Sequence, residues 1–381
     1  MQAVAIGWYL YDLTGEAMVL AYAGLSIFIP IALFTLPGGD LADRVDRRRI
    51  LTAAHLVQAV CAGILVVLAA NRNSHPAAFY AVLALSGTAR AFSGPAQPSF
   101  LPFLVPRENF PSAVAWSSSA GQTAVVLGPA LGGLIYLAGP EVTFGTCLVM
   151  SLAVATAMNA IRTRGVAPGV RSGTAVSRAL EGLKYVRAKP ILLGAISLDL
   201  FAVLMGSITG LLPIYARDIL GVGPQGLGIM RSSLAVGAVT MGLALAHLPA
   251  ARQPHAGRAL FCGVAVFGLA VLAFSVSTSF ALSIAILAVM GAADMVSVFV
   301  RASVIQLGTP EEMRGRVSAV HMLFVGATNE LGDFRAGAMA ALLGAAHAAM
   351  AGGLATLAVV ALWRALFPQL ARVERLSDVR T

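Results

Sequence analysis

The segment GGDLADRVDRRRIL, residues 38–51, places three aspartates and four arginines between two long apolar stretches. This concentration of charge is unusual, because only 11% of the 381 residues are charged and 58% are hydrophobic. Soluble domains carry roughly 25% charged residues, and the mean hydropathy of +0.83 also lies outside their range. The composition therefore indicates a membrane protein in which this segment holds a special position.

Apolar runs of about 20 residues recur along the chain, which is the length of a helix that crosses ~30 Å of hydrocarbon. A soluble chain of this kind would have to bury nearly every helix on all sides. We therefore expect an all-α membrane protein with eleven complete spans and the stub of another. The stub is residues 1–11, and the spans are 18–37, 50–70, 77–97, 113–138, 142–161, 191–212, 225–247, 257–276, 279–300, 317–343 and 346–368.

Basic residues in the expected loops predict the orientation of the chain. The loops after every second span and the C-terminal tail hold nearly all of the loop arginines and lysines, whereas the opposite loops hold Arg72 and Arg217. Cytoplasmic loops carry such an excess, so residues 38–51 and the C-terminus are expected in the cytoplasm. The net charge of +9 then reflects topology, and a nucleic-acid partner is not expected.

The two halves of the chain resemble one another. A shift of 204 residues aligns Ala115 with Ala319 and Arg90 with Asp294. Two parallel repeats about an axis along the membrane normal are typical of one large transporter class. We expect two six-helix halves related by a pseudo-twofold axis, with these boundaries: 1–161 and 191–370 for the halves, 162–190 for a basic cytoplasmic linker, and 371–381 for a cytoplasmic tail.

The same repeat bears on the start of the chain. The seventh span begins near residue 191, so its counterpart in the first half is expected to begin upstream of Met1. The eleven apolar residues at the start rise only ~16 Å as a helix, too little to cross. The interpretation is that the chain lacks most of the first helix, with a misplaced start codon as the preferred explanation.

The charged segment resembles the loop between helices two and three of the major facilitator superfamily. Its pattern, G-x-L-A-D-R-x-G-R-[RK], matches GDLADRVDRR from Gly39, with Asp46 where the family has glycine. WYLYDLTG, TPEEMRGRVSAV, NELGDF and ALWRALFPQLARVERL are similar to a narrower bacterial group, the enterobactin-exporter-like transporters. The resemblance implies a monomeric secondary transporter of the bacterial inner membrane, which exports a siderophore or drug against protons by alternating access.

The resemblance also assigns a role to the charged segment. In the family the acid equivalent to Asp43 pairs with helix ends and arginines of its own half and latches the outward-facing state. Gly39, Arg44, Arg47 and Arg48 would complete that latch. The alternative is a solvated basic loop that only sets topology.

Several ionisable residues fall near the middle of expected spans, where each is costly unless it is paired or faces water. They mark a candidate proton and substrate pathway: Arg90, Asp199, Asp294, Glu330, Asp333 and Arg335. The resemblance places the helices of Arg90, Asp199 and Asp294 around the central cavity, and Arg90 and Asp294 occupy matching repeat positions. The alternative is a structural ion pair that holds two helices together.

Glu330 and Asp333 are three residues apart and so share a helix face. Two carboxylates this close in a poorly solvated setting do not both ionise readily, so one of them is a candidate proton carrier. The alternative is that Arg335 or Arg301 neutralises them and that the cluster is an immobile gate.

A further motif lies in the fifth span, where Gly128, Pro129, Gly132 and Gly133 resemble the glycine-proline motif of antiporters in the superfamily. The resemblance implies a hinge that favours export. Small residues also let helices approach closely, so helix packing alone is the alternative.

Other chemistry is not indicated by the sequence. It holds no phosphate-binding loop that would couple transport to ATP, and its six histidines lack metal-ligand spacing, so neither cofactor nor metal is expected. The clustered catalytic residues of a membrane enzyme, such as an acyl or prenyl transferase, are absent. The resemblance to the major facilitator superfamily implies proton-coupled export as the expected function, with import of a small solute or a truncated, non-transporting remnant as alternatives.

Overall fold

The computed structural model describes residues 1–72, 75–161, 175–247 and 255–373, with the side chains of Asp43, Arg107, Pro111, Ala175 and Arg178 left out of the description. All regular elements in these ranges are helices. The chain divides into two units, Met1–Val176 and Ser177–Thr381, and each is considered by itself. Part of the expected linker, residues 162–174, lies outside the described ranges.

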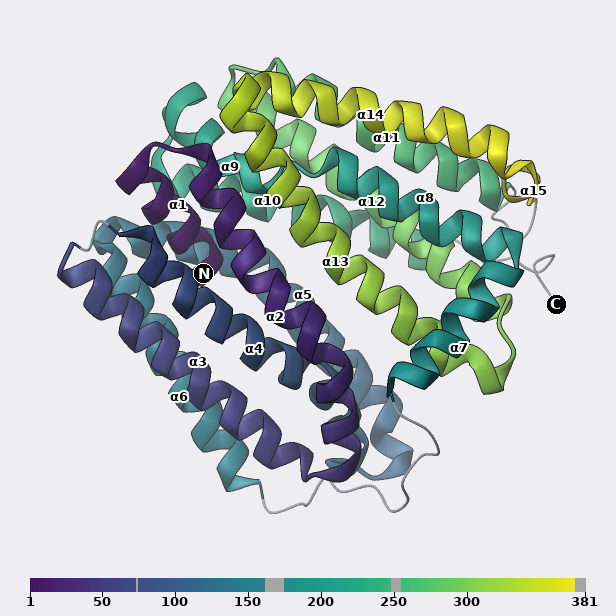
Figure 1. The fold of residues 1–381 in the computed structure, drawn as a ribbon, viewed down its shortest axis with the longest axis horizontal. Coiled ribbons are helices and arrows are strands. Elements are labelled where there is room, and N and C mark those ends of the chain that lie inside the picture. Colours follow the sequence, from purple (N-terminus) through teal and green to yellow (C-terminus); the bar gives the residue numbers. More distant parts are fainter. Residues whose placement is uncertain (73–74, 162–174, 248–254, 374–381) are drawn as a thin grey trace. The chain divides into compact units, whose positions relative to one another are not determined.

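The described residues of the first unit up to residue 161 form six α-helices (Figure 1), α1 Gln2–Thr14, α2 Ala17–Arg44, α3 Arg47–Ala70, α4 Pro76–Phe100, α5 Phe110–Ile135 and α6 Pro140–Ala160. Short 3₁₀ turns lie at Leu101–Phe103, Arg107–Asn109 and Tyr136–Ala138. Helix α4 packs against α2 and α3, and α6 packs along α3. Helix α1, with 13 residues, rises only ~20 Å.

The second unit begins within α7 Ala175–Ala188. Its described residues form six long helices and the short α15 Pro368–Ala371. The long helices are α8 Pro190–Gly206, α10 Gly223–His247, α11 Ala256–Ser275, α12 Phe280–Leu307, α13 Glu311–Leu343 and α14 Ala345–Leu366. Between α8 and α10 the chain forms a 3₁₀ turn η4 Thr209–Leu211, a short α9 Leu212–Ile214 and a π-helical turn η5 Tyr215–Ile219. Helix α12 lies between α10 and α11, and α14 packs on α8 and α11.

Nine of the described helical segments are long and apolar enough to cross a membrane. They are Ala17–Ala42, Arg47–Ala70, Ser112–Ala138, Pro140–Ala160, Pro190–Ile219, Gly223–His247, Ala256–Ser275, Phe280–Leu307 and Ala345–Leu366. Two more expected spans coincide with α4 and α13, whose charged residues, among them Arg90 and Glu330, lower their apolar content. The number of eleven complete spans thus stays a prediction.

The charged segment 38–51 differs from the expected loop. Helix α2 continues through it to Arg44, and α3 begins at Arg47, so only Val45 and Asp46 interrupt the helices. Residues 40–44 continue the helix because leucine, alanine and arginine have good helix propensity. Asp46 then caps α3, since its carboxylate accepts a hydrogen bond from the Arg48 backbone N–H at 3.0 Å.

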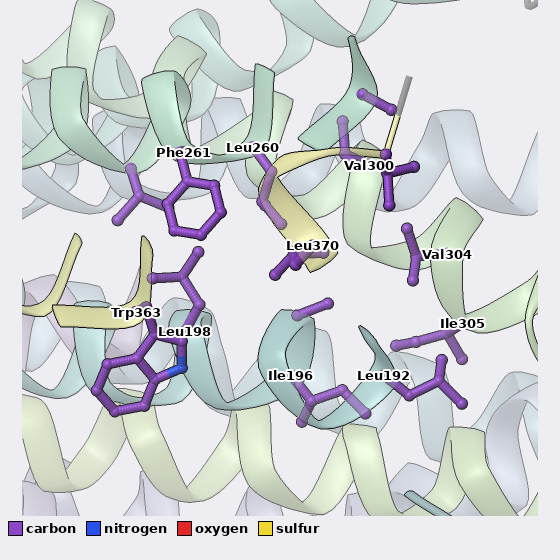
Figure 2. Close-up of a cluster of buried hydrophobic side chains, with 14 of the residues drawn as sticks. Leu192, Ile196, Leu198, Leu260, Phe261, Val300, Val304, Ile305, Trp363 and Leu370 are labelled. Atoms are coloured by element: carbon purple, nitrogen blue, oxygen red, sulfur yellow. The ribbon is translucent and has the colours of Figure 1, made fainter. Parts of the chain in front are cut away.

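The core of the second unit is a cluster of apolar side chains between α8, α11, α12, α14 and α15 (Figure 2). Leu192, Ile196 and Leu198 of α8 meet Val300 and Val304 of α12 in this cluster. The neighbouring Ser197 Oγ accepts a hydrogen bond from Trp363 Nε1 at 2.9 Å. This packing fixes the register of α8 against α12, and with it the positions of Asp199 and Arg301, which directly follow Leu198 and Val300.

Helices α10 and α12 approach each other through two glycines. A Cβ atom added at Gly237 would lie 1.8 Å from the Ala288 carbonyl oxygen, and one at Gly291 would lie 1.9 Å from the Leu234 carbonyl oxygen. These contacts are backbone to backbone, so they cannot be relieved by a side-chain rotation. The pair therefore requires glycine on both helices.

We predict that Gly291→Ala forces α10 and α12 apart and lowers the stability of the second unit by about 1–3 kcal/mol. Gly326→Ala on α13 is the matched control, because no heavy atom lies within 4 Å of its added Cβ. Thermal unfolding of the purified variants in detergent measures the difference. Equal melting temperatures of the two variants would contradict the packing described for α10 and α12.

Candidate functional site

The arginines of the charged segment make contacts within the first unit. Arg48 Nη1 donates a hydrogen bond to the Ile161 carbonyl oxygen at 2.6 Å, directly after the end of α6. The Arg47 guanidinium is buried and lies 5.1 Å from the centre of the Phe103 ring. A cation over an aromatic face is stabilised by the ring quadrupole. These two arginines thus join the start of α3 to the end of α6 and to the segment after α4.

Other parts of the expected latch are less constrained. Arg44 is exposed, and a Cβ added at Gly39 would meet open space. The side chain of Asp43 lies outside the description, so its role in the latch stays a prediction. Asp46, which the sequence analysis noted only as a departure from the family pattern, has the identifiable role of N-cap. Its signal was an aspartate directly before a helical arginine run.

The glycine-proline motif lies inside α5, which continues unbroken through Pro129 to Ile135. A Cβ added at Gly132 would lie 2.6 Å from Met1 Cα, and one at Gly128 would lie 3.7 Å from the Met1 nitrogen. Gly132 and Gly133 are buried. Close packing between α1 and α5 is therefore one function of Gly132, while the hinge role of the motif stays a prediction.

Arg90 is an exposed residue of α4. Within the described residues its side chain makes no hydrogen bond or ion pair. Asp294 belongs to the second unit, so the expected approach of Arg90 and Asp294 stays a prediction.

Asp199 and Arg301 form an ion pair between α8 and α12, with side chains only 8% and 4% exposed. A buried pair of this kind is held by mutual attraction, and the loss of either partner leaves a costly unpaired charge. Arg301 is thereby committed to Asp199. The suggestion that Arg301 neutralises Glu330 and Asp333 therefore does not describe this structure.

Asp333 of α13 contacts the chain where α8 ends. Its Oδ1 accepts hydrogen bonds from the Ser207 hydroxyl at 2.5 Å and from the Gly210 backbone N–H at 3.1 Å. Helix α8 ends at Gly206, and η4 begins at Thr209. The carboxylate thus satisfies donors at the start of the next helical turn, which would otherwise lack partners. We call residues 207 and 208, together with these flanking turns, the α8 break.

Arg335 contacts the other side of the α8 break. Its Nε donates to the Leu204 carbonyl oxygen at 2.9 Å, and its Nη2 donates to the Ser207 carbonyl oxygen at 3.3 Å. Carbonyl groups at a helix C-terminus carry partial negative charge, and a guanidinium stabilises them. Gly332 adds to the contact, because a Cβ there would lie 2.8 Å from Ser207 Cβ. Two residues apart on α13, Asp333 and Arg335 therefore hold opposite ends of one break.

This arrangement bears on the choice between proton carrier and gate. Asp333 Oδ1 accepts two hydrogen bonds at the α8 break, so these contacts fit a positioning role, while the choice between proton carrier and gate stays a prediction. Glu330 lies one turn earlier on α13 and is partly buried. Arg231 of α10 lies within electrostatic range of both carboxylates. From the sequence, Arg231 is expected near the outer end of its span, where a long side chain can reach the membrane surface, and its position near the two carboxylates was not predicted.

Comparison with known proteins covers nearly the whole chain. The family described as transmembrane secretion effector matches residues 1–378. The chain belongs to this family of major facilitator transporters. The superfamily resemblance is thus confirmed, whereas the match does not extend to the narrower enterobactin-exporter-like group.

Two bacterial relatives share part of the sequence. Macrolide efflux protein A of Streptococcus pyogenes is 28% identical over 254 residues, which cover 64% of this chain and 61% of the relative. A protein of the same name from Enterococcus faecalis is 32% identical over 122 residues, which cover 32% of this chain and 38% of the relative. The chain thus spans about three fifths of the length of the first relative.

Solved transporter structures share the fold. The nucleoside transporter NupG has a TM-score of 0.69 at 15% identity, covering 96% of this chain and 94% of its own. A bacterial homolog of the lysosomal transporter Spinster has a TM-score of 0.67 at 15% identity, covering 100% and 97%. Identities this low establish the fold alone. The similar structures confirm the all-α major facilitator fold. The family and these neighbours are transporters, not enzymes.

We predict that Asp333→Asn keeps most of the transport activity, because an asparagine oxygen can still accept from Ser207 and Gly210. Asp333→Ala leaves both donors unsatisfied and lowers stability by about 1–3 kcal/mol. Transport assays and thermal unfolding of the two variants, each normalised to inserted protein, test this. A complete loss of transport in a stably folded Asp333→Asn variant would show instead that Asp333 must carry a proton.

Proposed function

We propose that the chain is a secondary transporter that exports a small amphipathic organic compound, driven by inward flow of protons. The observation that carries the proposal is membership of the transmembrane secretion effector family over residues 1–378. The relatives named as macrolide efflux proteins support the outward direction. The setting we propose is the bacterial inner membrane, with a monomeric protein and a cytoplasmic C-terminus.

The proposed substrates share one chemistry. Macrolides, suggested by the named relatives, and catecholate siderophores, suggested by the resemblance of WYLYDLTG and NELGDF, both combine apolar and polar surfaces. A compound of this kind partitions into the membrane and can enter a transporter at mid-depth. We take a macrolide as the first substrate and a siderophore as its competitor.

The proposed proton carrier is Asp294 on α12. Asp199 is held by Arg301, and Asp333 is held by Ser207 and Gly210. By contrast, the partly buried Asp294 side chain makes no hydrogen bond or ion pair with any residue that the structure describes. A carboxylate at this depth is costly when charged, so it favours a proton whenever water is excluded and releases it when water enters.

The proposed cycle couples this carboxyl to alternating access. A proton from outside binds Asp294 and removes its charge, which lowers the cost of returning the empty transporter to the inward-facing state. Release of the proton to the cytoplasm restores the charge, and the substrate then binds. Each half moves as a near-rigid body in such transporters. The Asp43 latch would close the cytoplasmic side, and the motif at Gly128 and Pro129 would act as the hinge.

We predict that Asp294→Asn abolishes macrolide accumulation driven by a pH gradient in everted membrane vesicles, while Asp294→Glu retains a measurable part. An amide cannot exchange a proton, whereas a longer carboxylate can. Collapse of the pH gradient on adding macrolide, with a siderophore as competitor, gives the readout. In the unaltered protein, macrolide accumulation without proton movement would favour another driving ion. Movement of macrolide out of everted vesicles, which corresponds to uptake by the cell, would favour import. No transport at all would favour an inactive chain.

We predict that Asp43→Asn slows transport several-fold without loss of folded, inserted protein, because the latch loses its charge. Arg49→Gln is the matched control, since Arg49 is exposed and has no place in the expected latch. Initial rates of macrolide accumulation in vesicles with equal protein content are compared. A normal rate for Asp43→Asn would exclude the latch.

A further inference from the structure

A polar stripe runs along one face of α12 in the second unit. Asp294, Ser297 and Arg301 follow one another at intervals of three and four residues, the spacing that places side chains on the same helix face. The stripe extends ~10 Å along the helix axis. Ser297 is 2% exposed and Arg301 is 3% exposed. Most of the stripe is therefore enclosed by the surrounding helices.

Several buried polar atoms on and beside this stripe have no hydrogen-bond partner within the part of the chain that the structure describes. Ser297 Oγ, Arg301 Nε and Nδ1 of His321 on α13 are all buried, and none has a hydrogen-bond partner among the described residues. His321 lies within electrostatic range of Arg301. Buried polar groups without protein partners are normally satisfied by ordered water. Three such atoms along one face and its neighbouring helix provide anchoring points for a file of water molecules.

The charges along the stripe suit proton passage. An unpaired guanidinium would repel a proton that approached it, but the Arg301 charge is offset by Asp199 of α8. Arg301 acts electrostatically on His321, and its charge is offset by Asp199. His321 can bind a proton at one ring nitrogen and release one from the other.

The stripe also has an exit. Arg316 precedes His321 by five residues on α13, about 7.5 Å along the axis. It pairs with Glu181 of α7 at 3.1 Å, and these side chains are 39% and 51% exposed. Water therefore reaches the end of α13 on the side of its first turns, which the loop charges place in the cytoplasm.

From these observations we infer that Asp294, Ser297, Arg301 and His321 line a water-filled proton path within the second unit, which leads from mid-membrane toward the Arg316–Glu181 pair. The inference rests on the proposed function, since it gives the Asp294 proton its route to the cytoplasm. The proton leaves the Asp294 carboxyl for a water at Ser297 and passes to His321, which releases it toward the cytoplasm. Asp294 is left ionised, and Arg301 and Asp199 keep their charges throughout.

The test separates proton-coupled transport from substrate movement. Vesicles carrying the full chain are assayed for macrolide accumulation driven by a pH gradient, and for exchange of labelled against unlabelled macrolide at equal pH. Ser297→Ala removes a hydroxyl that would order water, and His321→Gln keeps hydrogen bonding but cannot relay a proton. Ser303→Ala is the control, because the Ser303 hydroxyl on α12 already donates to the Phe299 carbonyl at 2.9 Å.

The expected result is a loss of roughly 10-fold or more in proton-driven accumulation for Ser297→Ala and His321→Gln, with exchange unchanged. Ser303→Ala should change neither activity. Normal accumulation in both variants, or an equal loss of accumulation and exchange, would overturn the path while leaving proton-coupled export intact. Exchange without proton-driven accumulation in the unaltered protein would overturn the proposed coupling itself, and the path with it.

Discussion

The cost of placing charge away from water governs the second unit. Asp199, Arg301, Asp333 and Arg335 all lie on long helices of a chain built to be apolar, and each is held by a specific partner. Such partners determine how the helices align, because sliding one helix along another by one turn would leave a buried charge without its partner. The apolar cluster around Leu198 and Val300 packs α8, α11 and α12 together. Apolar packing is not directional, so the Asp199–Arg301 ion pair adds the preference for one alignment of α8 and α12.

A similar constraint acts on the backbone. A helix that stops inside a membrane exposes carbonyl and N–H groups that must find partners within the protein. At the α8 break these partners come from α13, with a cation at the carbonyl end and an anion at the N–H end. The charges that the sequence marked as a pathway are thus divided between two tasks. Asp333 and Arg335 contact both ends of an interrupted helix, and Asp294 is the residue to which we assign the proposed proton exchange.

Much of this fold was predictable from the sequence, because apolar length and the placement of arginines follow directly from the thickness and electrostatics of a bilayer. The charged segment was recognised for the same reason. Its details were not predicted: helix α2 continues through residues 38–44, Asp46 caps α3, and Arg48 contacts the carbonyl of residue 161. The last of these depends on a residue far away in the sequence. The partner of Arg301 was not predictable either, since Asp199 lies about a hundred positions away and competed with nearer carboxylates. The α8 break was not predicted, although Gly206 and Gly210 flank residues 207 and 208, because glycine is frequent in membrane helices and the contacts at the break come from Asp333 and Arg335 of α13.

The contacts of Asp333 and Arg335 also determine how motion passes through the second unit. Both residues lie on the continuous helix α13, and they contact opposite sides of the α8 break. A rotation of α13 about its own axis therefore carries both sides along, whereas a bend at the break alone would stretch one set of hydrogen bonds against the other. The α8 break therefore couples the two helices: a displacement of α13 is passed through Asp333 to the turn at Gly210 and, from there, to residues 211–219.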